Sequence, residues 1–165
     1  MTSQILRTQA SAEVTVLARL LRAHQALRRA LEVRLLADHG LTISDYETLL
    51  HLSREPEGRL RRIDLAERLL LTPSGITRLL EGLQRCGLVE KGTCDSDARV
   101  TYAVLTTAGR ERLEEAASGH SAVMADQIGS RLDADELEAL ASLLGRLPGG
   151  GETDGAACLP DDDST

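Results

Sequence analysis

The spacing of apolar residues changes partway along this chain, and that change constrains the fold more than any other feature. From about residue 61 to residue 86, Leu and Ile recur every three or four positions, which indicates two short helices. Thr72 is a favourable N-cap and Pro73 follows it at the first helical position, so the second of these helices begins here. From residue 89 to residue 105 the apolar period is two, which indicates two strands joined by a Gly-, Ser- and Asp-rich tip at 92–98. The central part of the chain is therefore helix, helix and β-hairpin, in that order.

Longer helical patterns precede this central part. Apolar residues recur every three or four positions over about residues 11–38, which predicts one long helix that ends at Gly40. Ser44 and Glu47 have the spacing of a capping box, which predicts a shorter helix over about residues 44–54. The first part of the chain therefore supplies two more helices.

Two further helices are expected after the hairpin. Thr106 can cap a fifth helix, and Asp133 with Glu136 forms a capping box for a sixth, whose Leu pattern continues to Leu147. Beyond this point apolar residues are few, and acidic, Gly and small residues dominate. We therefore expect residues 148–165 to be a disordered acidic tail.

Two short helices followed directly by a hairpin are typical of a winged helix-turn-helix. The chain has thirty Leu but no Phe, no Trp and only two Tyr, which suits a core of packed helices. We therefore expect a mainly α fold with a small β-hairpin. The scarcity of aromatic rings also argues against a surface that stacks the bases of single-stranded RNA or DNA.

Charge is distributed unevenly along the chain. The net charge is −7, yet residues 1–37 carry six basic and two acidic residues, and residues 59–99 carry eight basic and six acidic residues. Residues 111–147 and 148–165 are each net −5. Because local charge governs contact with nucleic acid, the first two-thirds of the chain can still face duplex DNA.

The second short helix carries side chains suited to reading duplex DNA. Small and hydroxyl-bearing residues at its start let the helix approach base edges, and Arg78 can form a bidentate pair with guanine. A solvated helix face without a partner is the alternative interpretation. The candidates for DNA contact on this helix are Thr72, Ser74, Gly75, Thr77, Arg78 and Arg85, and Lys91 follows on the first strand.

Two segments carry a family resemblance: LAERLLLTPSGITRLLEGLQRCGLVEK and SDARVTYAVLTTAGRERL. Together they resemble the multiple-antibiotic-resistance-regulator (MarR) family of bacterial transcription factors, and the similarity spans about residues 11–147. The features that carry it are Leu65–Glu67, Thr77–Leu80, Gly87–Val89, Asp97-x-Arg99, Leu105–Thr106 and Gly109.

The resemblance assigns roles to two residues of the hairpin tip. It implies that Arg99 enters the minor groove of DNA and that Asp97 orients it. A guanidinium is attracted by the negative potential of that groove, and a neighbouring carboxylate can fix its side chain. Ala98 departs from the family, in which an extra basic residue is common. An Asp/Arg surface pair without a DNA role is the alternative.

The Leu patterns at both chain ends exceed what a winged domain needs. The resemblance implies a homodimer in which the terminal segments interdigitate and hold two recognition helices about one DNA turn apart, roughly 34–36 Å. We therefore expect residues 1–40 and 107–147 to form a helical dimerisation region and residues 41–106 to form the winged helix-turn-helix domain. Packing of the terminal helices within one chain is the alternative.

The resemblance also implies a small anionic or phenolic effector, bound in a cleft between the dimerisation region and the winged domain. The first, second and fifth helices would line this cleft. Candidates for cationic or hydrogen-bonding contacts to such a ligand are His24, Arg28, Tyr46 and His51. Histidines without any ligand role are the alternative.

An enzyme is not expected. The chain has no G-x-S-x-G, no glycine-rich phosphate loop and no H-E-x-x-H, and its four histidines lie 15, 12 and 69 residues apart, which fits no metal-ligand pattern. We expect no cofactor or metal, and the three cysteines have no disulfide or ligand spacing. No stretch approaches the roughly 18 apolar residues of a membrane helix, and no signal-like run begins the chain, so we expect a cytoplasmic location without membrane contact.

These features predict a DNA-binding transcriptional regulator that binds a pseudo-palindromic duplex operator as a homodimer and represses transcription until a small ligand releases it. Activation in place of repression stays open. The alternative is a helical dimeric interaction protein that has lost DNA binding. Arg78 and Arg99 held in salt bridges would favour that alternative.

Overall fold

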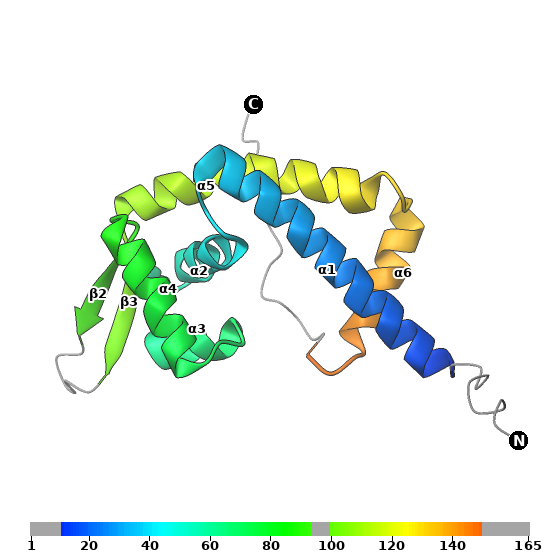
Figure 1. The fold of residues 1–165 in the computed structure, drawn as a ribbon, viewed down its shortest axis with the longest axis horizontal. Coiled ribbons are helices and arrows are strands. Elements are labelled where there is room, and N and C mark those ends of the chain that lie inside the picture. Colours follow the sequence, from blue (N-terminus) through cyan, green and yellow to red (C-terminus); the bar gives the residue numbers. More distant parts are fainter. Residues whose placement is uncertain (1–10, 94–99, 150–165) are drawn as a thin grey trace, which may run out of the picture.

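The computed structural model describes residues 11–93 and 100–149. The elements are, in chain order, α1 (Ala12–His39), α2 (Ile43–Ser53), a 3₁₀ turn η1 (Pro56–Gly58), β1 (Arg59–Arg61), α3 (Arg62–Arg68), α4 (Pro73–Arg85), β2 (Val89–Thr93), β3 (Thr101–Leu105), α5 (Thr107–Met124), a π-helical turn η2 (Ala125–Gly129) and α6 (Ala134–Gly145). Helices α1 and α5 extend away from the end of the molecule that contains α2, α3, α4 and the sheet, and α6 follows at the far end of α5 (Figure 1). The expected mainly α fold with a winged helix-turn-helix is confirmed.

Helix α4 begins at the N-cap that the sequence predicts. Thr72 Oγ1 accepts a hydrogen bond from the backbone N–H of Gly75 (3.1 Å), which starts α4. The helix stops at Gly87, which has φ 72°, and the N–H of Leu88 donates to the carbonyl of Leu83 (3.0 Å). Between α3 and α4 the chain turns through Leu70, which adopts φ 52° and is 93% exposed.

The start of α2 differs from the sequence prediction. Thr42, and not Ser44, is the N-cap: Thr42 Oγ1 accepts from the N–H of Asp45 (3.1 Å), and the Thr42 N–H donates to Asp45 Oδ2 (2.9 Å). Both residue pairs have capping-box spacing. The earlier start places the buried Ile43 in the first turn of the helix, and Glu47 bonds with α1 and makes no cap.

The predicted hairpin is part of a three-stranded antiparallel sheet. Strands β2 and β3 pair with Lys91 opposite Ala103, which confirms the hairpin. The third strand, β1, was not predicted; it pairs with β3 through Leu60 and Ala103, in the strand order β1-β3-β2. Three residues are too few to display an alternating pattern, so only the contact with β3 reveals this strand. The predicted tip at 92–98 falls largely outside the described residues.

The core lies where α2, the C-terminal half of α1, α5 and the helix-turn-helix meet. Its side chains are aliphatic apart from Tyr46, as the composition predicts. The one buried polar residue among those described, Thr48, donates its hydroxyl to the carbonyl of Ser44 (2.7 Å). The largest fully buried side chains are Tyr46, Leu35, Leu49, Leu52, Leu65, Ile76 and Val89.

Two side chains, one from α5 and one from α1, cap the junction between α1 and α2. Arg112 of α5 donates from Nη1 to the carbonyl of His39 (2.8 Å), which lies at the end of α1. Glu32 of α1 accepts at Oε2 from the N–H of Ile43 (2.7 Å), the first residue of α2. Between them Gly40 adopts φ 65°, where an L side chain would be strained. These contacts fix the winged domain to α1 and α5.

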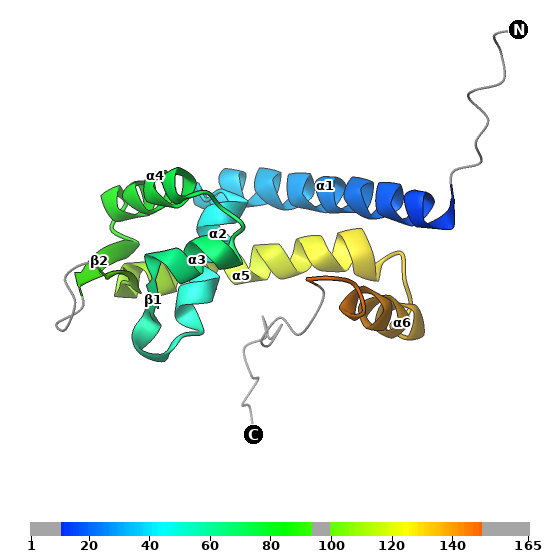
Figure 2. The same cartoon turned by 90° about the horizontal axis from the view of Figure 1, so that it is seen from below.

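Helix α6 has few contacts with the rest of the described chain. Asp133 and Glu136 form the predicted capping box of α6, and no residue of α6 is buried. The helix lies at the end of α5 that is far from the sheet (Figure 2). Thr106 caps α5 as predicted, and a π-helical turn at Ala125–Gly129 follows that helix. Among the described residues, no helix combines the length and apolar content needed to cross a membrane.

Candidate nucleic-acid interface

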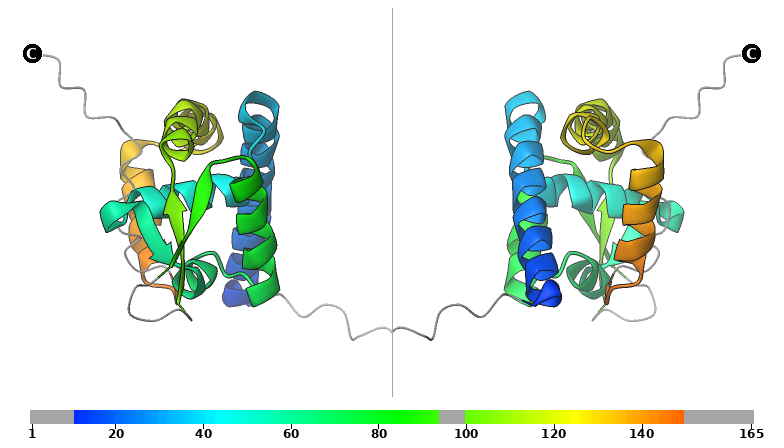
Figure 3. Two further views of the ribbon diagram at one scale, coloured as in Figure 1. Left: turned by 90° about the vertical axis from the view of Figure 1, so that its left-hand side faces the viewer. Right: turned by 90° about the vertical axis from the view of Figure 1, so that its right-hand side faces the viewer.

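Helix α4 presents its polar face outward because its apolar face is embedded in the core. Ile76, Leu80 and Leu83 are buried. On the other side Ser74 and Arg78 are exposed. The helix lies at the surface beside the sheet (Figure 3). Arg78 therefore lies on the solvent-exposed face of α4.

The remaining candidates on α4 are partly engaged with their own helix. The side-chain oxygens of Thr72 and Ser74 lie 3.2 Å apart. Thr77 is half-buried and donates its hydroxyl to the carbonyl of Pro73 (2.8 Å), and Arg85 donates from Nε to the carbonyl of Glu81 (3.3 Å). A Cβ at Gly75 would lie 3.2 Å from the Thr72 hydroxyl, so the glycine keeps the first turn narrow.

A groove of about 250 Å³ separates α4 from the hairpin. Its walls include Thr77 and Glu81 of α4, Lys91 of β2, Tyr102 of β3 and Arg62 of α3. Lys91 is exposed, so the structure brings this candidate to the same surface as Thr77. Helix α4 and the hairpin therefore form the two sides of one groove.

Most arginines near α3 are paired with carboxylates. Arg61 makes a two-point contact with Asp64 (2.6 and 2.8 Å), and this hydrogen bond and charge raise the pKa of Arg61. Two further pairs are Arg68 with Glu55 (2.6 Å) and Arg59 with Glu57 (3.6 Å), and the Arg59 guanidinium also lies 4.1 Å from the ring centroid of Tyr102.

Four cations on this surface lack such a partner. Within residues 11–93 and 100–149, no carboxylate lies within ion-pair distance of Arg62, Arg78, Arg85 or Lys91. The sequence prediction missed Arg62 because it sits in a run of arginines whose pairing depends on the fold. Asp97 and Arg99 lie outside the described residues, so their roles stay predictions.

The four ligand candidates have different neighbours. His24 is exposed on α1, and Arg28 Nη1 lies 3.3 Å from Glu47 Oε1 of α2. Tyr46 is 1% exposed and stacks on His120 of α5, with centroids 4.8 Å apart and planes inclined by 13°.

His51, the fourth candidate, lies at the other end of α2. Burial lowers the pKa of His51, and the nearby charges of Arg68 and Arg54 lower it further. Tyr46 packs in the core whereas His24 is exposed, so the candidates have different surroundings, and their ligand role stays a prediction.

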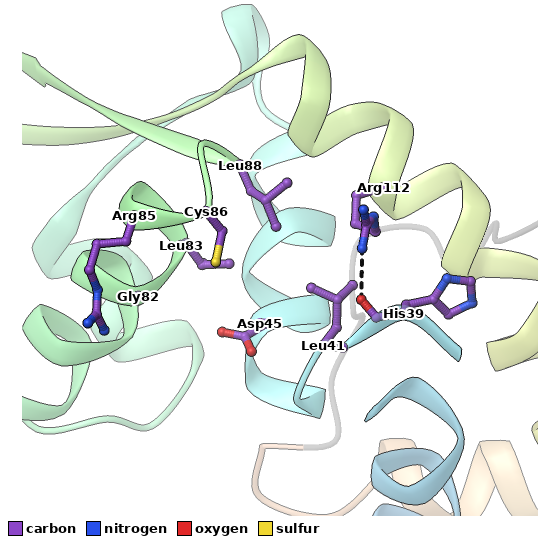
Figure 4. Close-up of a pocket in the computed structure, with 10 residues that line it drawn as sticks. His39, Leu41, Asp45, Gly82, Leu83, Arg85, Cys86, Leu88 and Arg112 are labelled. Atoms are coloured by element: carbon purple, nitrogen blue, oxygen red, sulfur yellow. Dashed lines mark hydrogen bonds between the residues drawn. The ribbon is translucent and has the colours of Figure 1, made fainter. Parts of the chain in front are cut away.

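A different pocket lies at the junction of α1, α2, α4 and α5. It has a volume of about 590 Å³, and Leu41, Leu83 and Leu88 supply its apolar walls (Figure 4). Asp45 and Arg112 supply charged groups that the sequence prediction did not select. Among the described residues, no group of three His, Cys, Asp or Glu side chains is arranged to hold a metal ion.

The fold and the exposed face of α4 define a winged helix-turn-helix protein, and comparisons with known proteins place it in a family. A model of the MarR family matches residues 39–100. The transcriptional repressor MdtR of Bacillus subtilis is 30% identical over 115 residues, which are 70% of this chain and 72% of that protein. This chain belongs to the MarR family.

Two other relatives agree with this assignment. The transcriptional repressor YetL of Bacillus subtilis is 38% identical over 92 residues, which are 53% of this chain and 55% of that protein. The crystal structure of Sco3205, a MarR family regulator from Streptomyces coelicolor in complex with DNA, matches with a TM-score of 0.74 and 29% identity. That match covers 81% of this chain and 84% of that one.

Proposed function

We propose that this chain is a DNA-binding transcriptional repressor, with α4 in the major groove and the hairpin in the minor groove of a duplex operator. The observation that carries the proposal is the outward face of α4, where Arg78 is exposed without a carboxylate partner among the described residues. The structure of Sco3205, which shares the fold, contains DNA. The relatives YetL and MdtR are transcriptional repressors. We also propose the cytoplasm as its location.

We further propose that the repressor is a homodimer. The face of α1 that buries Leu31 and Leu35 continues toward the N-terminus through Leu17 and Leu20, which are exposed. Helix α6 buries none of its residues, although its leucines follow helical spacing. A second copy of these helices would cover both surfaces. The two-fold symmetry of such a dimer matches a pseudo-palindromic operator whose half-sites lie about one DNA turn apart.

Selection of bound sequences from a random duplex pool tests this function. We expect an enriched pseudo-palindrome with half-sites about one helical turn apart, roughly 10 base pairs. Arg78→Ala should then relax base preference and cost about 1–3 kcal/mol per contacted base pair, measured by fluorescence anisotropy. Arg54→Ala, which removes an equal charge from the exposed end of α2, is the matched control. Absence of any enriched sequence would favour an interaction protein that has lost DNA binding.

We propose that a small anionic or phenolic effector releases the operator. The pocket in Figure 4 supports this proposal because it lies between the end of α4 and the helices that fix the winged domain. Arg28 and His24 stay ligand candidates on α1, whereas Tyr46 and His51 would need to leave their buried neighbours. Aromatic carboxylates tested for release of the selected duplex would check this step.

A further inference from the structure

Arg62 differs from the arginines around it. It is the first residue of α3, and its side chain is exposed. Its sequence neighbour Arg61 is held by two hydrogen bonds to Asp64, which neutralises that charge. Arg62 has no carboxylate within ion-pair distance among the described residues. Two adjacent arginines therefore carry the same charge, but only that of Arg62 is left uncompensated.

The side chain of Arg62 is tethered to the recognition helix. Its Nη1 donates a long hydrogen bond of 3.5 Å to Oγ1 of Thr77. The same hydroxyl donates its proton to the carbonyl of Pro73 at 2.8 Å. Because a hydroxyl has one proton, Thr77 has no donor left for a base edge, and its oxygen acts as an acceptor for Arg62.

This arrangement places a free guanidinium beside α4. Arg62 lines the groove between α4 and the hairpin, across which Lys91 supplies a second cation. In a helix-turn-helix the first helix crosses the DNA backbone while the second enters the major groove. A guanidinium has five N–H donors, so four remain after the bond to Thr77, and they suit the oxygens of one phosphate.

We propose that Arg62 binds a phosphate of the DNA backbone and that Thr77 positions its guanidinium for this contact. The contact does not depend on base sequence, unlike the contact proposed for Arg78. The proposal rests on the proposed DNA-binding function and assigns Thr77 a positioning role in addition to any contact of its own with DNA.

The test compares Arg62→Ala with Arg61→Ala by fluorescence anisotropy over 50–200 mM salt. Each protein is titrated against the duplex recovered by selection and against a scrambled duplex of equal length. Loss of one phosphate contact in each of two subunits lowers the salt slope by about 1.8. The affinity advantage of the wild type over Arg62→Ala should therefore shrink about 12-fold between 50 and 200 mM salt, on both duplexes. Arg61→Ala should leave the slope close to that of the wild type.

Two further variants separate the charge from its positioning. Arg62→Lys should restore the salt slope, because the positive charge returns. Thr77→Val should leave the slope unchanged but lower affinity about two- to tenfold at every salt concentration, because Arg62 loses its fixed geometry. In the Arg62→Ala background, Thr77→Val should have no such effect.

Three results would overturn the proposal. These are an unchanged salt slope in Arg62→Ala, a loss of affinity confined to the selected duplex, and an equal loss of slope in Arg61→Ala. A wild-type protein without salt-dependent affinity for either duplex would overturn the proposed function as well. Equal melting temperatures of Arg62→Ala and Arg61→Ala would show that the comparison concerns binding and not folding.

Discussion

Replacing Gly109 with Ala should loosen α5 from the winged domain. Gly109 lies in the first turn of α5, where its N–H donates to Thr106 Oγ1 (3.0 Å). A Cβ built at this position would lie 2.1 Å from the carbonyl oxygen of Leu88 and 2.8 Å from Cδ1 of Leu105. Gly109 is one of the residues that carry the family resemblance. The close approach of the Leu88 carbonyl explains why a glycine fits at this position.

The cost of the substitution can be worked from these contacts. An unstrained contact between carbon and oxygen is about 3.3 Å or longer, so α5 must move by more than about 1 Å. Overpacking of this kind costs about 1–3 kcal/mol. The movement also stretches the bond from the Thr106 N–H to the Leu88 carbonyl (3.2 Å), which contributes about 1 kcal/mol. The higher helix propensity of Ala returns up to about 1 kcal/mol, so the net loss is about 1–3 kcal/mol.

Thermal unfolding followed by circular dichroism measures this loss. The melting temperature should fall by about 2–12 °C, since 1 kcal/mol corresponds to about 2–4 °C at this chain length. Gly119→Ala is a control on the same helix, because its nearest atom is His39 Nε2 at 3.7 Å, an ordinary contact. That variant should gain about 0.5–1 kcal/mol. If Gly109→Ala were as stable as the wild type, the steric argument would be refuted.

Four further predictions concern other parts of the chain. Leu140→Asp on α6 should give monomers or unfolded chains in light scattering, because an unpaired charge in an apolar dimer interface costs several kcal/mol; an unaltered dimer would contradict this. Leu70→Gly should stabilise the protein by about 0.5–1 kcal/mol in denaturant unfolding, since Leu70 adopts φ 52° and is exposed, whereas Leu70→Ala should not. Burial lowers the pKa of His120 from 6.5, so the unfolded chain binds protons more readily, and stability should fall as pH drops from 7.5 to 5, less so in His120→Asn. Asp97→Ala should weaken operator binding if Asp97 orients Arg99 as the family resemblance implies; tighter binding would refute that role.

The features that could be predicted from the sequence are those with local causes. The starts of α4, α5 and α6 were predictable because Thr72, Thr106 and Asp133 each accept a hydrogen bond from an N–H three residues later. The end of α4 also has a local cause, since the positive φ of Gly87 belongs to the helix stop itself. The helix-turn-helix and hairpin therefore followed from short stretches of sequence.

The features that were missed depend on contacts between distant segments. Strand β1 exists through pairing with β3, some forty residues later, and its three residues have no pattern of their own. Tyr46 was a ligand candidate by chemistry, but its ring packs on His120 across 74 positions of sequence. Arg62 could be distinguished from Arg61 only once Asp64 was seen to pair with one of them. A capping pattern depends on residues close in sequence, whereas the partner of a strand, ring or charged side chain depends on the fold.

Helix α1 is long enough to turn a small rotation at one end into a large displacement at the other. Its 28 residues span about 42 Å at about 1.5 Å per residue, and its C-terminal end is fixed to the winged domain through Arg112 and Glu32. A rotation of about 5° at the N-terminal end would displace the other end by about 4 Å, from the same helix rise. In the proposed dimer such a displacement changes the separation of the two α4 helices by a full base-pair step or more. A ligand or substitution near the start of α1 can therefore disturb operator binding without touching any residue that faces DNA.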